Sequence, residues 1–168
     1  MADYDAAEAI LDLLQTSTAT GAAAIRNLLA RGANSIVEAR DFDESDVREA
    51  EDDRRILADD AQGVALLLTV EDLGDDPDEN RVDHEVQFVG LRIYDRQRGY
   101  ANIRKVRKAI RDWLFSEEAW EDTALTGAGI LSLGYGGRSG HTYSAEHGVE
   151  LEAISVRAQV IRVIETYD

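Results

Sequence analysis

The chain contains three histidines and no cysteine, so imidazoles are the only nitrogen or sulfur side chains that could bind a metal tightly. His84, His141 and His147 lack the His-Glu-x-x-His spacing that aligns two imidazoles on a zinc-binding helix. Asp and Glu are so frequent that neighbouring carboxylates arise by chance and do not single out a general acid and base. We therefore expect no catalytic residue, no metal and no cofactor.

One short turn offers an enzymatic alternative. Residues 96–101, Arg-Gln-Arg-Gly-Tyr-Ala, resemble the Arg/Gln-x-x-Gly-x-Gly/Ala turn of GNAT-type acetyltransferases and lie between a predicted strand and a predicted helix. The resemblance implies that N–H groups at the helix N-terminus hold the coenzyme A pyrophosphate. The binding residues would be Arg96, Arg98, Gly99 and Ala101. The later Asn and Tyr elements of that family's acetyl-CoA site are not found, so a GNAT-like acetyl-CoA-dependent N-acetyltransferase is kept only as the alternative function.

A glycine-rich stretch at residues 134–148 fits no motif for phosphate binding or nucleophilic attack. It lacks the Gly-Lys-Ser/Thr ending of a P-loop, and Ser132, Ser139 and Ser144 lie in no nucleophile-elbow pattern. We predict a mobile loop that becomes ordered when a partner docks. Its candidate contact residues are Gly134, Tyr135, Gly136, Gly137, Arg138, Ser139 and Gly140.

The N-terminal part of the chain is predicted to be helical. Apolar residues at helical spacing predict helix over residues 5–31, either bent or divided in two by the polar run at residues 16–20. Strands are predicted at residues 35–40 and 64–70. Residues 73–80 contain the only proline and are predicted to form a hairpin loop.

The second half of the chain predicts a sheet with one helix packed on it. Residues 83–95 alternate in a way that makes both faces apolar, which predicts a strand buried on both faces, the second by another layer or a neighbouring subunit. An amphipathic helix over residues 99–115 follows, then strands at 127–135 and 149–163. The fold class is α/β (α+β), with a small mixed or antiparallel sheet flanked by an N-terminal helix and one central amphipathic helix. We expect one domain over residues 1–168, with an acidic excursion at residues 41–60.

Charge restricts the partners that this chain can bind. Its 34 acidic and 18 basic residues give a net charge of −16, which disfavours unaided binding to nucleic-acid phosphates or anionic membrane. Lys105 and Lys108 are the only lysines, all other cations are Arg, and Asp outnumbers Glu. This composition is typical of proteins from salt-rich cytoplasm, and an acidic protein from an ordinary cytoplasm is the alternative. No basic leader followed by an apolar run and no stretch of about 18 apolar residues is present, so we expect a soluble protein that is not secreted by a signal peptide and has no membrane partner.

The central helix carries a cluster of cations on its polar surface. They are Arg104, Lys105, Arg107, Lys108 and Arg111. This surface fits a solvated face that balances nearby carboxylates, a contact with an acidic partner or an identical acidic neighbour, or a site for a phosphate-bearing ligand. If this surface is a contact between subunits, a variant with Arg107→Glu and Arg111→Glu should assemble less well while its monomer stays folded.

The order of elements over most of the chain resembles that of tail terminator or tail-completion proteins of tailed viruses. The resemblance is carried by the N-terminal helix, residues 64–70, the strand at 85–95, the helix at 103–114, and the loop at 134–140 before a long last strand. It implies a virion protein of the head-tail neck, assembled in the host cytoplasm as a homo-oligomer, in a hexameric ring that caps the tail tube. Its partners would be the tail-tube protein and the head-tail connector proteins, and genomic DNA would pass through without sequence-specific binding. The composition would make the host a haloarchaeon, and a head-completion or stopper protein is a related alternative.

Overall fold

The computed structural model describes residues 5–41, 67–77, 84–95, 100–144 and 149–161. The α-helices are α1 (Ala6–Thr16), α2 (Thr20–Asn27), α4 (Ala101–Leu114), α5 (Glu117–Trp120) and α6 (Thr123–Thr126), and the 3-10 helices are η1 (Gly32–Ser35) and η2 (Ala39–Asp41). The strands are β1 (Ile36–Glu38), β2 (Leu67–Pro77), β3 (His84–Asp95), β4 (Ile130–Arg138), β5 (Thr142–Ser144) and β6 (Val149–Ile161).

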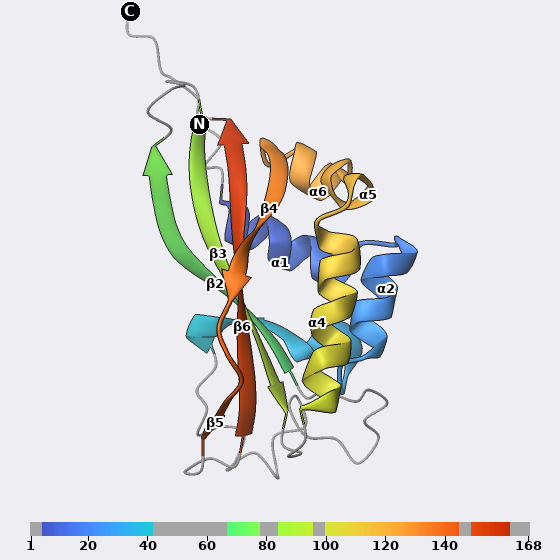
Figure 1. Cartoon of the computed structure of the whole chain (residues 1–168). Helices are drawn as coiled ribbons and strands as arrows, with labels where there is room; N and C mark the ends of the chain where they lie inside the picture. Colours follow the sequence, from blue (N-terminus) through green and yellow to red (C-terminus); the bar gives the residue numbers. More distant parts are fainter. Residues whose placement is uncertain (1–4, 42–66, 78–83, 96–99, 145–148, 162–168) are drawn as a thin grey trace, which may run out of the picture.

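The strands form one six-stranded sheet in the order β1-β2-β3-β6-β4, with β5 also pairing β6. β1 is parallel to β2 and every other pair is antiparallel, so the sheet is mixed. The longest pairing joins β3 to β6 without a register shift, from His84 opposite Ile161 to Asp95 opposite Glu150. β6, the last strand in the described part of the chain, therefore lies inside the sheet (Figure 1).

The α-helices lie together on one face of this sheet (Figure 1). The predicted stripes of α1 and α4 are buried and form one apolar cluster with the inward residues of β3 and β6. Asp5 caps α1 by accepting a hydrogen bond from the Glu8 N–H, and the polar run at residues 16–20 separates α1 from α2. The predicted α+β class, with an N-terminal helix and a central amphipathic helix on a mixed sheet, is confirmed.

Helices α2 and α4 approach closely at Gly21. A Cβ atom on Gly21 would lie 2.2 Å from Cδ1 of Trp113, so the indole packs directly on the α2 backbone. Glycine supplies the space that this contact needs, because any other residue would overlap the ring.

The two faces of β3 differ in burial. Val89, Leu91 and Ile93 are buried against the helices, as predicted. On the other face Tyr94 is buried in a small cluster with Ala30, Leu67 and Val149, whereas Val86 and Phe88 are only half-buried. The described residues thus cover the second face of β3 at one end only, and its covering by a neighbouring subunit stays a prediction.

Two predicted loops are partly strand. Residues 73–77 continue β2, because a register shift between Asp72 and Asp75, with Gly74 at φ +98°, lets pairing with β3 resume. Residues 134–138 likewise continue β4 beside β6, with a second shift between Tyr135 and Arg138 that includes Gly137 at φ +105°. The predictions of a hairpin loop from residue 73 and of a loop over residues 136–138 were therefore wrong, since Gly74 and Gly137 mark bulges within strands.

Several predictions concern residues outside the described part of the chain. They are the acidic excursion apart from Asp41, which ends η2, and Arg96, Arg98 and Gly99 of the alternative acetyl-CoA turn. Residues 145–148 of the glycine-rich stretch are also outside it. Among the helices that are described, none has the length and apolarity to cross a membrane.

Candidate functional site

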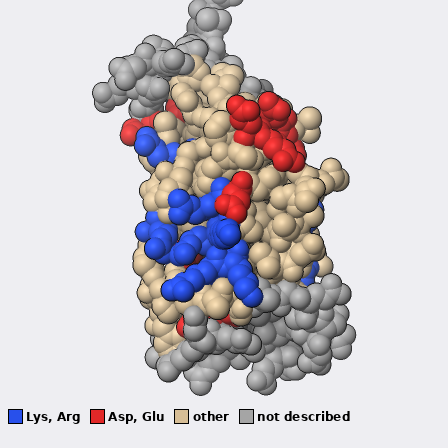
Figure 2. All heavy atoms as spheres, turned by 45° about the vertical axis from the view of Figure 1, so that its right-hand side comes forward, with Lys and Arg blue, Asp and Glu red and all other residues tan. Residues whose placement is uncertain are grey.

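Five cations lie on the part of α4 that its buried apolar residues leave free, and Figure 2 shows Lys and Arg gathered in one patch on this side of the molecule. Four of them are exposed, namely Arg104, Lys105, Lys108 and Arg111. We call these four side chains the basic face. It forms because the apolar residues of α4 recur at helical spacing and leave the remaining surface to charged residues.

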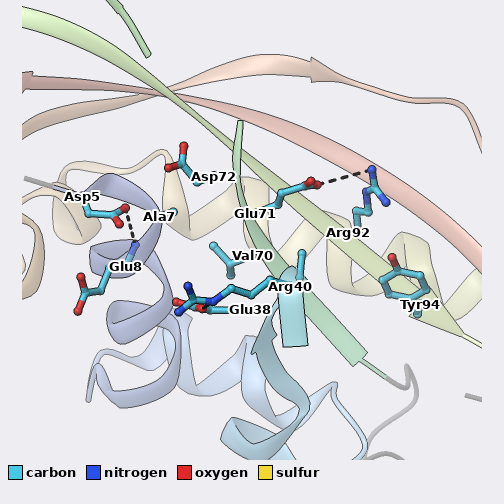
Figure 3. Close-up of a pocket in the computed structure, with 11 residues that line it drawn as sticks. Asp5, Ala7, Glu8, Glu38, Arg40, Val70, Glu71, Asp72, Arg92 and Tyr94 are labelled. Carbon is cyan, nitrogen blue, oxygen red and sulfur yellow. Dashed lines mark hydrogen bonds and ion pairs between the residues drawn. The ribbon is translucent and has the colours of Figure 1, made fainter. Parts of the chain in front are cut away.

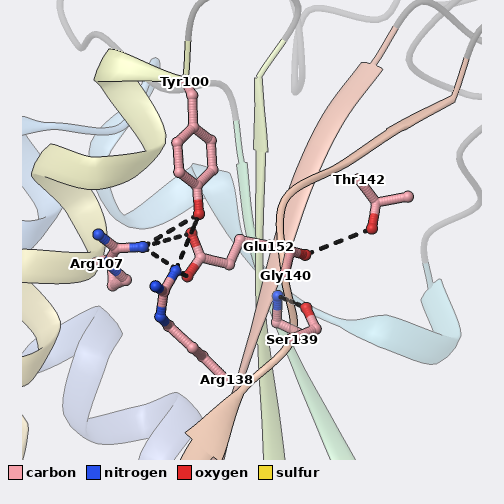
Figure 4. Close-up of polar contacts among 8 residues, drawn as sticks. Tyr100, Arg107, Arg138, Ser139, Gly140, Thr142 and Glu152 are labelled. Atoms are coloured by element: carbon pink, nitrogen blue, oxygen red, sulfur yellow. Dashed lines mark hydrogen bonds and ion pairs between the residues drawn. The ribbon is translucent and has the colours of Figure 1, made fainter.

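Arg107 differs from these four cations. Its side chain is only 19% exposed, and its Nη1 atom lies 2.8 Å from Oε1 of Glu152, a carboxylate with no exposed surface. Arg138 reaches the same oxygen from β4, at 2.9 Å, and the Tyr100 hydroxyl donates to Oε2 (Figure 4). The cluster of Tyr100, Arg107, Arg138 and Glu152 therefore ties the start of α4 to β4 and β6.

The cluster places Glu152 in an unusual electrostatic environment. Burial raises the pKa of the Glu152 carboxyl to about 7, while the two guanidinium groups oppose this rise by favouring the charged form. Burial, and then the charge of Arg138, lowers the pKa of Arg107. Because one carboxylate is shared by two cations, the cluster carries an excess of positive charge when Glu152 is ionised and a larger excess when it is protonated.

A second buried carboxylate lies at the N-terminus of α4. The Tyr100 N–H donates to Oε2 of Glu150 at 3.1 Å, and Nε2 of His141 lies 3.5 Å from Oε1 of the same residue. The rings of Tyr100 and His141 pack with centroids 4.2 Å apart. Tyr100 has φ +65°, a conformation that is uncommon for a residue with a side chain. A coenzyme A pyrophosphate at the start of α4 would meet Glu150 and compete for this N–H.

The structure brings together two sets of residues that the sequence predicted separately. Arg138 of the glycine-rich stretch meets Arg107 at Glu152, and the guanidinium of Arg111 lies 4.3 Å from the ring centroid of Tyr135. Gly134 and Gly136 lie against β6, where a Cβ on Gly136 would come within 3.0 Å of Oγ of Ser155. Ser139 pairs with Ala153 of β6, and Gly140 is exposed. The basic face and β4 thus form one continuous surface.

Tyr100 and Glu152 were not predicted as site residues. Glu152 does carry a signal in the sequence, because it occupies the inward register of β6, two residues before Ile154. An acidic residue at an inward position requires cationic or hydrogen-bonding partners, and these partners are distant in sequence.

A groove with the opposite charge lies beside the N-terminus of α1, β1, η2 and β2 (Figure 3). Its volume is about 660 Å³. The charged residues that line it are Asp5, Glu8, Glu38, Glu71 and Asp72, with Arg40 and Arg92. We call it the acidic groove. Arg40 pairs with Glu38, and Arg92 lies 3.6 Å from Glu71, so ion pairs offset two of its five carboxylates. No prediction from the sequence pointed to these residues.

In the described part of the chain, no group of three or more His, Asp or Glu residues is placed to hold a metal ion.

No family model and no curated protein matches the sequence. Solved structures do match the fold. One is a chain from the virion of a native gene transfer agent particle, at a TM-score of 0.52 and 11% sequence identity. The match covers 93% of this chain and 94% of that chain, and at this identity it shows a shared fold.

Proposed function

We propose that this protein is a structural virion protein of the head-tail neck, which caps the tail tube as a ring and joins it to the head connector. The observation that carries the proposal is the fold match over 93% of this chain and 94% of a chain from a gene transfer agent virion. A match over nearly the whole of both chains is expected when two subunits share an architecture, whereas a shared supersecondary motif would cover only part of each.

The distribution of charge supports a role in assembly. One surface of the described chain is basic and another is acidic, so identical copies offer complementary contacts. The net charge of −16 disfavours a tight grip on DNA, which suits a ring through which a genome passes. The proposal includes the tail-terminator position, a tail-tube partner and a haloarchaeal host, each of which rests on the resemblance and composition described above.

An acetyltransferase is the weaker proposal. The N-terminus of α4 would have to accept a pyrophosphate beside Glu150, which is buried. Anion binding at a helix N-terminus depends on N–H groups that are available to the ligand, and that of Tyr100 is donated to Glu150. We therefore propose a function in which no bond of a substrate is made or broken.

The test of the proposed function is the native mass of the protein in molar KCl, with electron microscopy of the same sample. Closed rings of about six subunits are the expected result, because heterologous contacts close into rings when their rotation permits. Addition to virus tails that lack this protein should then block further growth of the tube and allow heads to attach. Attachment to heads alone would instead support the stopper position.

A control separates the enzymatic alternative. Acetyl-CoA should leave the thermal unfolding midpoint unchanged, because a ligand raises it only by binding the native state. A monomer whose midpoint rises with acetyl-CoA, and which neither forms rings nor binds tails or heads, would overturn the proposed function.

A further inference from the structure

We infer that the acidic groove of one copy of this chain receives the basic face of the next copy, so that subunits join head to tail. This inference rests on the proposed function and deepens it, because it names the two surfaces of the contact between subunits.

The first argument is the position of the two surfaces. The acidic groove borders β1 and β2, at one edge of the sheet. The basic face adjoins β4, the other end of the strand order, where Arg111 lies over Tyr135 and Arg138 binds Glu152, the carboxylate that Arg107 of α4 also binds. A subunit with complementary surfaces at opposite edges can bind one copy on each side, which is the arrangement that a ring requires.

The second argument is charge complementarity. The groove has five carboxylates and two guanidinium groups, a net charge of −3, and the basic face has four exposed cations. Each surface repels a second copy of itself, so a symmetric contact of basic face with basic face, or of groove with groove, is disfavoured. The heterologous pairing is the one that brings opposite charges together.

The third argument is the edge that borders the groove. Beyond Val70, where its pairing with β1 ends, β2 pairs only with β3 among the described strands. This segment carries Glu71, Asp72, Asp75 and Asp76 and contains the register shift at Gly74. Charge and a bulge oppose the addition of another strand to an edge. The partner of this edge is therefore expected to be a cationic surface, and α4 supplies one.

Two lysines provide probes with which the contact can be tested. The chain has two lysines among its 18 cations, and both lie exposed on the basic face, at Lys105 and Lys108. Unlike Arg107, neither is joined to Glu152, so reversing their charge does not place a second carboxylate beside a buried one. Lys105 and Lys108 are therefore better probes of the contact than Arg107. The sequence predicted that Arg107→Glu leaves the monomer folded, but this change would put a second carboxylate beside the buried Glu152.

The experiment uses two reversed proteins and their mixture. One carries Lys105→Glu and Lys108→Glu, and the other carries Glu8→Lys and Glu38→Lys. Each protein by itself should self-associate about 10- to 100-fold more weakly than wild type, because the first pair of changes takes the basic face from four cations to no net charge, and the second takes the groove from −3 to +1. Mixed in equal amounts they should assemble, since an alternating ring has one contact with the wild-type pairing and one in which the new glutamates meet the groove that carries the new lysines. Native mass and sedimentation in the KCl concentration that keeps wild type folded provide the measurement.

A matched control changes the same charge elsewhere. Glu117→Lys with Glu118→Lys alters two exposed carboxylates of α5, outside the basic face and the acidic groove, and should assemble as wild type does. Far-ultraviolet circular dichroism and thermal midpoints confirm that each variant is folded.

The outcomes separate this inference from the proposed function. Loss in each reversed protein with recovery in the mixture supports the inference. Rings that form in both reversed proteins overturn it while leaving the ring and the proposed function in place. A mixture that fails to assemble, although each protein is folded, also overturns it, as does a wild-type chain that stays monomeric. In these last cases binding to tails still tests the proposed function independently.

Discussion

Arg107 and Glu152 are 45 residues apart in the sequence, yet a guanidinium nitrogen of Arg107 lies 2.8 Å from a carboxylate that has no exposed surface. Arg107 belongs to the surface of α4, and Glu152 belongs to the central strand β6. Their contact turns one cation of a solvated helix surface into part of the interior. The charged surface of α4 therefore has two roles, since Arg107 stabilises the subunit and its exposed neighbours are available to a partner.

Arg107→Ala should lower the free energy of unfolding by about 3 kcal/mol, because it leaves a buried carboxylate with one cation fewer. Arg138→Ala should cost about 1 kcal/mol or less, since the Arg138 side chain is 44% exposed. Lys108→Ala, on the same helix but exposed, should change stability by no more than about 0.5 kcal/mol. Urea unfolding in molar KCl measures all three. Equal losses for the two arginine variants would contradict the distinct roles assigned to them.

The contribution of Glu152 to the free energy of unfolding should fall as the pH rises from about 4.5 to about 7.5. The folded pKa of Glu152, about 7, lies above the value of about 4.3 for an unfolded Glu, so the folded state binds more protons in this range. This contribution is complete below the unfolded pKa and is lost as the pH passes the folded pKa. Glu152→Gln should remove this part of the pH dependence, whereas Glu117→Gln on the exposed surface should retain it. Parallel urea midpoints across the pH range for wild type and Glu152→Gln would show that Glu152 does not titrate there.

Gly21→Ala should destabilise the protein by about 2 kcal/mol, because its new methyl group overlaps the Trp113 indole and forces α2 and α4 apart. Gly140→Ala is the matched control, since nothing lies within 4 Å of the Cβ that it adds. Thermal unfolding followed by tryptophan fluorescence reports both stability and the environment of the indole. A change at Gly21 as small as that at Gly140 would show that the two helices are not packed as described.

Asp122→Ala should cost about 1–2 kcal/mol. The Asp122 side chain accepts the Ala124 N–H at the start of α6, and its other oxygen accepts the Ser17 hydroxyl at 3.0 Å. Asp122→Asn should recover most of the loss, because an amide oxygen can still cap the helix. If Asp122→Ala unfolds at the wild-type urea concentration, the connection between the end of α1 and α6 adds nothing to stability.

Local patterns in the sequence predicted most of the helices and strands. The stripe of α4 and the alternation of β6 depend on the burial of one face, which periodicity records directly. The loop predictions were wrong where glycine was taken to end a strand. Gly74 and Gly137 instead occupy bulges, and whether a strand resumes after a bulge depends on a partner strand distant in sequence.

The candidate site was predictable only where its residues are close together in the sequence. The basic residues of α4 are close in sequence and were predicted as a group. The meeting of Arg107, Arg138 and Glu152 depends on the order of the strands, which puts β4 next to β6. The acidic groove depends on β1 pairing with β2, and local periodicity carries no information on either pairing.

The position of β6 also determines when this fold can be completed. β3 and β4 do not pair with each other, and both pair with β6, so residues 149–161 join the two parts of the sheet. During synthesis, a nascent chain that has not yet reached Val149 can pair β2 with β3 but cannot attach β4 to them. Contacts of such long sequence separation form slowly, because the entropy of closing the intervening chain must be overcome first. The folding of this subunit therefore waits for one of its last described segments, and the surfaces on β4 and α4 reach their final positions only then.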